Sequence, residues 1–491
     1  MILLKLINHK RLYYLESMCI LFFPGIKIKT ADNLRGDRHN IKVSSRLIFF
    51  GNGVRGVTEI SADGKKARSV CSEKGGSDKN IQSVLKKSFY NAALRITEIN
   101  VPWGVLTGIR PSKIAIKLMN KGYDEKNIIK VFEEEYYTDK NKALLCIETA
   151  KHGRKAASFS QINSASLYIA IPFCPSRCAY CSFVSHSVEQ AAKLIPVYVD
   201  RLCEEIKAVG KVIKNCKLKL ESIYIGGGTP SVLTAEQIKR LLNAIKEHID
   251  INSIREFTFE AGRPDTITDE KLAVLRQFQK MRLSINPQTL SDDILVNIGR
   301  EHTVKQFFDA FGKARDAGFD FINADLIAGL PEDSFDSFKR SLDGILALSP
   351  ENITVHTLCV KRAAHLTMEG KADYSADSTV VSDMLDYAVK NLSKNGYHPY
   401  YMYRQKNTVG NLENIGFAKE GFDCLYNIFM MDEVHTVLGA GAGAVTKLVN
   451  PYDKSISRVY NYKYPYEYIE RFDDILKDKD KVELFYERLE N

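Results

Sequence analysis

The chain has 491 residues, 45% of them hydrophobic and 26% charged, with a formal net charge of +9 at pH 7. This length exceeds one ordinary hydrophobic core and the composition is typical of a globular protein, so we expect two or three domains. The apolar run at residues 19–26 is too short to span a membrane, no secretion signal precedes it, and no arginine-rich or aromatic-interleaved basic stripe indicates nucleic acid, so a cytoplasmic protein is expected.

Residues 1–160 are predicted to form an N-terminal α+β accessory domain. Apolar runs at 45–51 and 54–60, joined through a Gly-Asn-Gly turn, predict a β-hairpin. From about residue 80 to 157 the apolar spacing becomes helical. A breaker-rich loop at 102–111 holds the only tryptophan, Trp103, which we expect to be a structural anchor.

A polar, small-residue stretch at 153–166 is the expected linker to a second domain, residues 161–395. There, short apolar strands alternate with helical stretches, which predicts right-handed crossovers and a parallel sheet. No strand is followed by a dinucleotide-binding glycine motif, so a barrel or partial barrel fits better. The predicted strands are 166–171, 222–227, 256–261, 282–286, 321–327 and 352–358, and the predicted helices lie around 190–209, 235–248, 269–279, 303–317 and 334–347.

Polar and glycine-rich residues follow these predicted strands. The motif GGGTP at 226–230 ends the second strand, Glu260 ends the third, Gln288 follows the fourth and Asp325 lies near the end of the fifth. Because the carboxyl ends of parallel strands share one edge of a barrel, we expect these residues to line one pocket.

Three of the ten cysteines, Cys174, Cys178 and Cys181, form a C-x₃-C-x₂-C array directly after the first strand. The other seven are isolated and are expected to be reduced thiols. A structural zinc site needs four ligands, and His186 is a candidate for the fourth. A cubane iron–sulfur cluster normally has four cysteine ligands, so three cysteines would leave one iron open for an exogenous ligand.

The array resembles the signature of radical S-adenosylmethionine (radical SAM) enzymes. The resemblance implies a partial (β/α)₆ barrel and a [4Fe–4S] cluster held by Cys174, Cys178 and Cys181. It also implies that the open iron chelates the amino and carboxylate groups of SAM. An electron from the cluster would then cleave SAM to methionine and a 5′-deoxyadenosyl radical that abstracts hydrogen from the substrate.

Further motifs resemble the oxygen-independent coproporphyrinogen III oxidase family, and the N-terminal region is similar to its HemZ-like branch. They are LYIAIPFCPSRCAYCSF, IYIGGGTPSVL, LSINPQT, IGREHT, DLIAGLP and PWGVLTGIRP. The resemblance implies oxidative decarboxylation of two propionates to vinyl groups, giving protoporphyrinogen IX without oxygen. It also implies a tetrapyrrole substrate and an electron donor such as flavodoxin or ferredoxin.

The family's SAM contacts carry over to nine positions of this chain. In the family some of these positions serve a second SAM molecule. The net positive charge fits a substrate with four carboxylates, although scattered solvated lysines would give the same charge. Lys361 and Arg362, just beyond the sixth strand, are candidates for binding those carboxylates. The nine SAM-binding candidates are Tyr168, Tyr180, Gly227, Gly228, Thr229, Glu260, Gln288, Arg300 and Asp325.

The sequence departs from the family at two places. The oxidases carry a fourth cysteine two residues after the third, where this chain has Phe183. Heme chaperones, a related branch, also have an aromatic residue there, but they carry an H-N-x-x-Y-W motif, whereas residues 426–431 here read YNIFMM. The alternatives are therefore a heme-binding chaperone, with His435 as a possible iron ligand, or another radical SAM reaction on a tetrapyrrole.

Residues 396–491 are predicted to form a small C-terminal domain that contributes to the substrate pocket. Residues 397–407 are rich in tyrosine, which suits stacking against a porphyrin-sized ring. Residues 438–445 are rich in glycine, which permits close backbone approach. Residues 466–491 read as one or two surface helices.

Overall fold

The structure is a computed structural model that describes residues 1–34, 41–99, 101–108, 110–181, 186–278, 280–359, 377–405 and 408–490. Its contacts form two compact units, each described by itself. The first contains the described parts of 1–147, 373–379 and 404–412, and the second those of 148–372, 380–403 and 413–491. Phe183, Lys361 and Arg362 lie outside the described residues.

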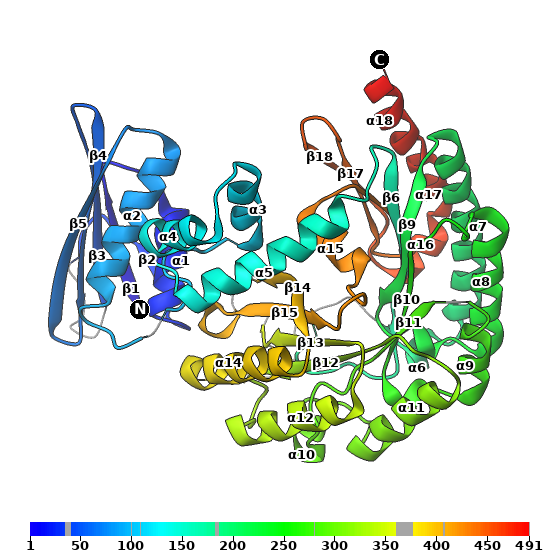
Figure 1. Ribbon diagram of the computed structural model, residues 1–491. Helices are drawn as coiled ribbons and strands as arrows, with labels where there is room; N and C mark the ends of the chain where they lie inside the picture. The colour runs from blue at the N-terminus through cyan, green and yellow to red at the C-terminus, as the bar shows by residue number, and fades with distance from the viewer. Residues whose placement is uncertain are drawn as a thin grey trace. The chain divides into compact units, whose positions relative to one another are not determined.

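The first unit is a five-stranded sheet in the order β2-β1-β3-β4-β5, with α2 packed on β4 and β5 (Figure 1). β3 and β4 pair antiparallel from Lys42–Ser61 to Phe50–Gly53, which confirms the predicted hairpin. Its elements are β1 (Ile2–Ile7), α1 (Leu12–Phe22), β2 (Ile28–Thr30), β3 (Ile41–Phe50), β4 (Gly53–Ala62), β5 (Lys65–Lys74), α2 (Asp78–Ala93), α3 (Ser112–Asn120) and α4 (Glu125–Tyr136).

The loop that carries Trp103 is a packed part of this first unit. Trp103 is 1% exposed, and the guanidinium of Arg404 lies 4.9 Å from its ring centroid. Arg404 also donates a hydrogen bond to the carbonyl of Leu106 at 2.6 Å. Gly104 has a φ of +53°, and a Cβ there would lie 2.2 Å from the Tyr136 carbonyl oxygen, so only glycine fits. These contacts support a structural role for Trp103.

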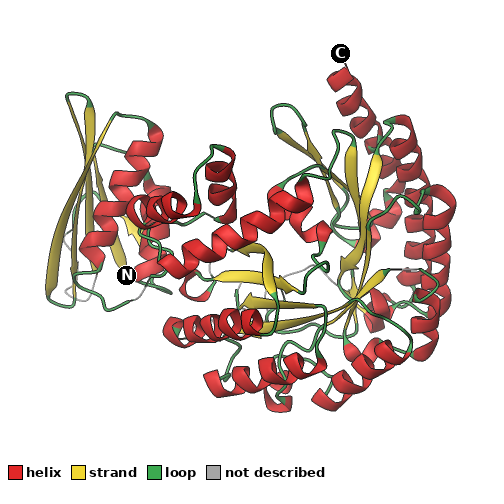
Figure 2. Ribbon diagram, in the orientation of Figure 1, coloured by secondary structure: helices red, strands yellow, loops and turns green. Residues whose placement is uncertain are grey.

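The second unit is built on six parallel strands with helices on their outer side (Figure 2), as the alternation of strands and helices predicted. Near-continuous burial along strands such as β6 is typical of strands covered on both faces. The parallel strands are β6 (Ser164–Ile171), β9 (Lys219–Gly227), β10 (Glu256–Gly262), β11 (Met281–Ile285), β12 (Ile322–Ala328) and β13 (Asn352–Thr357), and the helices between them are α6 (Val188–Ala191), α7 (Leu194–Asn215), α8 (Ala235–His248), α9 (Asp269–Leu275), α10 (Asp292–Asn297), α11 (Val304–Asp316) and α12 (Phe335–Leu348).

Capping residues in the sequence determine where two of the outer helices begin. α8 starts at a capping box, in which Thr234 and Gln237 each bind the other's backbone N–H, and α11 starts at the same device, made by Thr303 and Gln306. In both helices one face is buried against the sheet and the other is exposed. This amphipathic pattern agrees with the partial (β/α)₆ barrel that was predicted.

Strands from the C-terminal part extend this sheet at both edges. β15 and β14 follow β13 on one side, and β16, β17 and β18 follow β6 on the other. The division of the sequence at residues 160 and 395 stays a prediction, although the contacts group residues 413–491 with the barrel. The elements are α14 (Ser378–Lys394), β14 (His398–Arg404), β15 (Glu413–Ala418), α15 (Leu425–Asp432), β16 (Thr436–Ala440), β17 (Val445–Val449), β18 (Ile456–Tyr460), α16 (Pro465–Glu470), α17 (Phe472–Asp478) and α18 (Asp480–Glu490).

The stretch predicted as a polar linker is mostly regular structure. Helix α5 (Lys140–Ala157) continues through its first residues, and β6 begins at Ser164. Small and polar residues are compatible with a half-exposed helix end, which is why composition alone was misleading here. Within the described ranges, no helix is long and apolar enough to cross a lipid bilayer.

Candidate functional site

The three cysteines lie on the loop that follows β6, at the carboxyl end of the parallel sheet. Cys174 ends the short strand β7 (Phe173–Cys174), which pairs with β8 (His186–Ser187). Cys178 is buried, Cys174 and Cys181 are partly exposed, and none of the three forms a disulfide bond. The Cys181 amide donates to the Cys178 carbonyl at 3.1 Å, which makes a tight turn between them.

The spacing of the three sulfurs argues against a single zinc ion. Ligands of one tetrahedral zinc lie within about 4 Å of one another. Within the described part of the chain, no set of three cysteine or histidine ligand atoms from this loop comes within 4.8 Å of one another. His186, the candidate fourth ligand, instead contacts the edges of Tyr464 and Tyr466. The wider set suits a multi-iron cluster better.

Two guanidinium groups approach the Cys178 sulfur. Arg263 Nη1 lies 3.9 Å and Arg300 Nη1 3.8 Å from Cys178 Sγ. Arg300 also donates to the Tyr180 hydroxyl at 3.4 Å and to the Gly262 carbonyl at 3.1 Å, so its head group is fixed. Positive charge beside this sulfur would offset the negative charge of a cluster that Cys178 ligates. The residues present therefore fit a cysteine-held iron–sulfur cluster.

The glycine motif that ends β9 packs directly against the cysteine loop. A Cβ at Gly228 would lie 2.5 Å from the Phe173 carbonyl oxygen and 3.0 Å from the Cys174 sulfur. The amides of Gly227, Gly228 and Thr229 donate to Glu260 Oε2, the Ile171 carbonyl and the Phe173 carbonyl. Protein oxygens therefore accept from all three N–H groups, and the role of these residues in binding SAM stays a prediction.

Replacing Gly228 with alanine is expected to disturb the cysteine loop. The added methyl group has no room, so we expect a loss of about 1–3 kcal/mol in the free energy of unfolding and a lower iron content after anaerobic reconstitution. Gly312→Ala is the matched control, because a Cβ at Gly312 meets nothing within 4 Å in helix α11. Equal iron content and stability in the two variants would contradict this account of the motif.

Glu260, at the end of β10, is a carboxyl group with an unusual environment. The Tyr224 hydroxyl donates to Oε1, and the Gly227 amide donates to Oε2 at 3.3 Å. Burial raises the pKa of Glu260 to about 7, and the nearby Asp325 carboxylate adds to the rise, against the lowering by Tyr224. Glu260 can therefore hold or release a proton near neutral pH.

Asp325 lies near Glu260 and is also buried, but it stays ionised. His356, on β13, places Nε2 3.7 Å from Asp325 Oδ2, and Asn323 donates to Oδ1 at 2.8 Å. Burial alone would raise the pKa of Asp325, but His356 and Asn323 outweigh it and lower it. Burial would lower the pKa of His356, and Asp325 reverses this. The pKa values of two neighbouring carboxyl groups are thus shifted in opposite directions.

Glu260→Gln should change the pH dependence of stability. A raised carboxyl pKa means that the folded state binds a proton that the unfolded state has lost. The free energy of unfolding therefore falls as pH rises from the ordinary value of 4.5 to about 7. The glutamine variant lacks this loss, so its stability relative to wild type should rise by about 1–3 kcal/mol between pH 5 and pH 8. Urea titrations at both pH values measure it, and a pH-independent difference would contradict it.

Gln288 and three tyrosines lie near the carboxyl pair. Gln288 has a left-handed φ of +70°, and its buried Oε1 has no hydrogen-bond partner among the described residues. Such an orphaned acceptor is what a polar ligand would satisfy. The Tyr224 ring centroid lies 4.5 Å from that of Tyr426 and 6.2 Å from that of Tyr168, which makes a stacked aromatic wall.

The predicted site residues therefore fall into two connected groups in the second unit. The residues around the cysteine loop are Cys174, Cys178, Tyr180, Cys181, Gly228, Thr229 and Arg300. Tyr168, Gly227, Glu260, Gln288 and Asp325 gather around the carboxyl pair and the tyrosines. Their predicted roles in binding SAM stay predictions.

Sequence reasoning missed three residues of the site, namely Arg263, His356 and Tyr224. Each lies in or directly after a predicted strand, so position at a strand end was the available signal for Arg263 and His356. Tyr224 lies in the middle of an apolar run, where tyrosine is usual in a core, so only its spatial pairing with Glu260 shows its importance.

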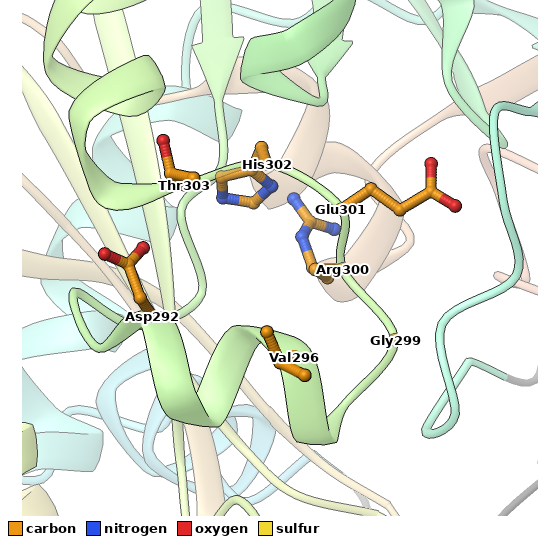
Figure 3. Close-up of a pocket in the computed structure, with 7 residues that line it drawn as sticks. All are labelled: Asp292, Val296, Gly299, Arg300, Glu301, His302 and Thr303. Atoms are coloured by element: carbon orange, nitrogen blue, oxygen red, sulfur yellow. The ribbon is translucent and has the colours of Figure 1, made fainter.

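A small cavity lies behind the cysteine loop, beside Arg300 (Figure 3). Its volume is about 280 Å³, and it is lined by α10 and the segment that follows it. The Ala179 amide of the cysteine loop donates to the Ile298 carbonyl at 2.9 Å, so this segment supports the loop. The cavity is below the usual size for a drug-sized ligand, which makes it too small for a tetrapyrrole.

The chain matches known proteins over this region and beyond it. Residues 168–345 match the model of the radical SAM superfamily. That is the superfamily the cysteine array predicted, and its cofactors are a [4Fe–4S] cluster and SAM. The chain is 38% identical over 416 residues to the oxygen-independent coproporphyrinogen-III oxidase-like protein HemZ of Bacillus subtilis, covering 84% of this chain and 83% of that protein.

The chain is also similar to a second curated protein and to a solved structure. It is 33% identical over 299 residues to the heme chaperone HemW of Lactococcus lactis, covering 60% of this chain and 73% of that protein. A solved structure of coproporphyrinogen III oxidase (HemN) from Escherichia coli, a radical SAM enzyme, superposes with a TM-score of 0.51 at 23% identity, covering 66% of this chain and 72% of that one. This likeness confirms the fold. The chain thus belongs to the radical SAM superfamily and, within it, to the family of oxygen-independent coproporphyrinogen-III oxidase-like proteins.

Proposed function

We propose that this protein is an oxygen-independent coproporphyrinogen III dehydrogenase, which converts two propionate side chains to vinyl groups and yields protoporphyrinogen IX. The observation that carries the proposal is the buried carboxyl pair, Glu260 and Asp325, whose pKa values are shifted in opposite directions beside the glycine motif that packs on the cysteine loop. Bound cluster and SAM would supply one-electron chemistry and hydrogen abstraction. An electron donor such as flavodoxin or ferredoxin would complete the system.

The chain's own residues would prepare this pocket in three ways. Arg263 and Arg300 would hold negative charge at Cys178. Glu260 would keep a proton, or give it up, at Oε2 or Oε1 near neutral pH. The stack formed by Tyr168, Tyr224 and Tyr426 would exclude water and offer flat apolar surface to a ring.

A second candidate function is heme binding, which the likeness to heme chaperones and Phe183 favour. Aligned on Asn427, the chaperone motif would place its histidine at residue 426, where this chain has a buried tyrosine stacked on Tyr224. His435 is buried as well, and its Nε2 lies 2.8 Å from Ser166 Oγ, which supports a structural role. Burial also lowers the pKa of His435 to about 3.

One anaerobic experiment separates these functions. Reconstituted protein is incubated with SAM, a reductant and coproporphyrinogen III, and the tetrapyrroles and carbon dioxide are measured. Vinyl product with release of carbon dioxide supports the proposed dehydrogenase. Tight stoichiometric heme binding without turnover would replace it with a chaperone, and a methylated or ring-opened tetrapyrrole would replace it with another radical SAM reaction.

A further inference from the structure

A histidine pair and one aspartate meet at a place in the second unit that the proposed reaction does not use. His152 lies on α5, His398 begins β14, and Asp423 lies in the loop between β15 and α15. His152 Nδ1 is 3.1 Å from Asp423 Oδ2, and His398 Nε2 is 2.6 Å from Asp423 Oδ1. The two imidazole rings are stacked, with centroids 3.7 Å apart and planes 10° from parallel.

The arrangement has the donor types and the spacing of a metal site. The three ligand atoms all lie within 4.8 Å of one another, a proximity that no other set of three such residues reaches within the described ranges. Ligands on one tetrahedral ion, at 2.0–2.2 Å from the metal, are about 3.4 Å apart. The His152–Asp423 distance of 3.1 Å lies close to this value, whereas the His398–Asp423 distance of 2.6 Å is that of a direct hydrogen bond. The His398 and Asp423 side chains would therefore have to move apart to admit an ion.

The surroundings hold the ligands in place, as supporting residues do in metal sites. The Asp423 carbonyl accepts from Arg282 Nη2 at 3.2 Å, and the Leu425 amide donates to Glu256 at 2.8 Å, which fixes the loop on both sides of residue 424. Glu420 Oε2 lies 3.9 Å from His398 Nδ1, the nitrogen that faces away from Asp423. Glu420 also pairs with Lys155 at 2.9 Å, so it is an exposed carboxylate near the His398 ring and not a hydrogen-bond partner of it.

Burial is intermediate, with side-chain exposures of 16% for His152 and 18% for His398 and Asp423. Solvent can therefore reach the site and supply the remaining ligands as water. Two imidazoles and one carboxylate are the donor set of borderline divalent ions such as zinc, whereas magnesium and calcium prefer oxygen donors only.

We propose that His152, His398 and Asp423 bind one divalent cation of the zinc class, with water in the open position, and that this cation fastens α5 to the sheet edge at β14. The site is separate from the cysteine loop and does not depend on the proposed reaction. Bound metal would stabilise the folded state by an amount that grows with the logarithm of its concentration relative to its dissociation constant.

The test uses full-length protein with its iron–sulfur cluster reconstituted anaerobically, so that the cysteines are occupied. Zinc is added and unbound metal is removed by dialysis, and zinc and iron are measured together. We expect one equivalent of zinc beyond the cluster iron and a higher thermal midpoint with zinc but not with magnesium. Wild-type protein that retains no zinc, or that magnesium stabilises equally, would overturn the proposal.

Variants locate the bound ion. His152→Gln and Asp423→Asn should each weaken zinc binding at least about tenfold and abolish the zinc-dependent rise in thermal midpoint, with iron content unchanged. His248→Gln is the matched control, because His248 is a partly exposed histidine beside a carboxylate on α8 and should bind zinc as wild type does. Wild-type zinc affinity in both site variants would overturn the assignment, whatever the outcome of the coproporphyrinogen assay.

Discussion

Cys178→Ala should reduce SAM cleavage to the background level and lower the iron content of the reconstituted protein. Cys178 is the buried member of the array, and two guanidinium groups lie within 4 Å of its sulfur. Removing it would leave two cysteines for a cluster that needs at least three protein ligands to leave one iron open. The measurements are iron and sulfide content, and the amount of 5′-deoxyadenosine formed with SAM and reductant.

Cys203→Ala is the control for this variant. Cys203 is a partly exposed thiol on α7, outside the array, and its replacement should leave iron content and SAM cleavage unchanged. If Cys178→Ala still produced 5′-deoxyadenosine at the wild-type rate, the assignment of the cluster to this loop would be wrong. A loss in both variants would indicate general instability of the preparation.

Arg282→Met should have the largest effect on stability, because it leaves a buried carboxylate without its countercharge. The side chains of Arg282 and Glu256 are 5% and 7% exposed and form an ion pair. Arg282 also donates to Asn352 Oδ1 at 2.9 Å and to the Phe422 carbonyl at 2.9 Å. Breaking such a pair from one side costs about 3–5 kcal/mol. Anaerobic urea titration followed by circular dichroism measures the change.

Two comparisons make this prediction specific. The double variant Arg282→Met with Glu256→Met should recover part of the loss, because it removes the unpaired charge as well. Arg240→Ala breaks an exposed pair with Asp200 and should cost less than about 1 kcal/mol. Similar losses for Arg282→Met and Arg240→Ala would show that burial of the ion pair contributes nothing to stability.

Much of the barrel could be predicted because its strands are short apolar runs with helices of regular period between them. Predicted strand 256–261 is observed as Glu256–Gly262, and predicted helix 235–248 is observed as Ala235–His248. The first unit was harder to predict. β5 (Lys65–Lys74) carries many charged residues and becomes a strand because β4 pairs with it along its whole length. Tertiary pairing of this kind outweighs local propensity.

Site residues could be predicted from the sequence where they lie at the carboxyl ends of predicted strands. Glu260 and Asp325 could be predicted from their position in the sequence. The opposite shifts of their pKa values could not, because these depend on Tyr224, His356 and Asn323 in space. The cluster of His152, His398 and Asp423 could be predicted even less well from the sequence. His152 and Asp423 are 271 residues apart in sequence, and neither belongs to a spaced motif that would indicate a ligand.

The pairing of β6 with β16 has a consequence for how the protein is made. In this parallel pair Ala165 lies opposite Thr436, so one edge of the first barrel strand has its partner only after all the other barrel strands. During translation that edge would stay uncovered on the nascent chain until β16 has left the ribosome. An exposed apolar strand edge is prone to aggregation, so holdase chaperones should associate with this chain during synthesis and leave once its last strands are in place.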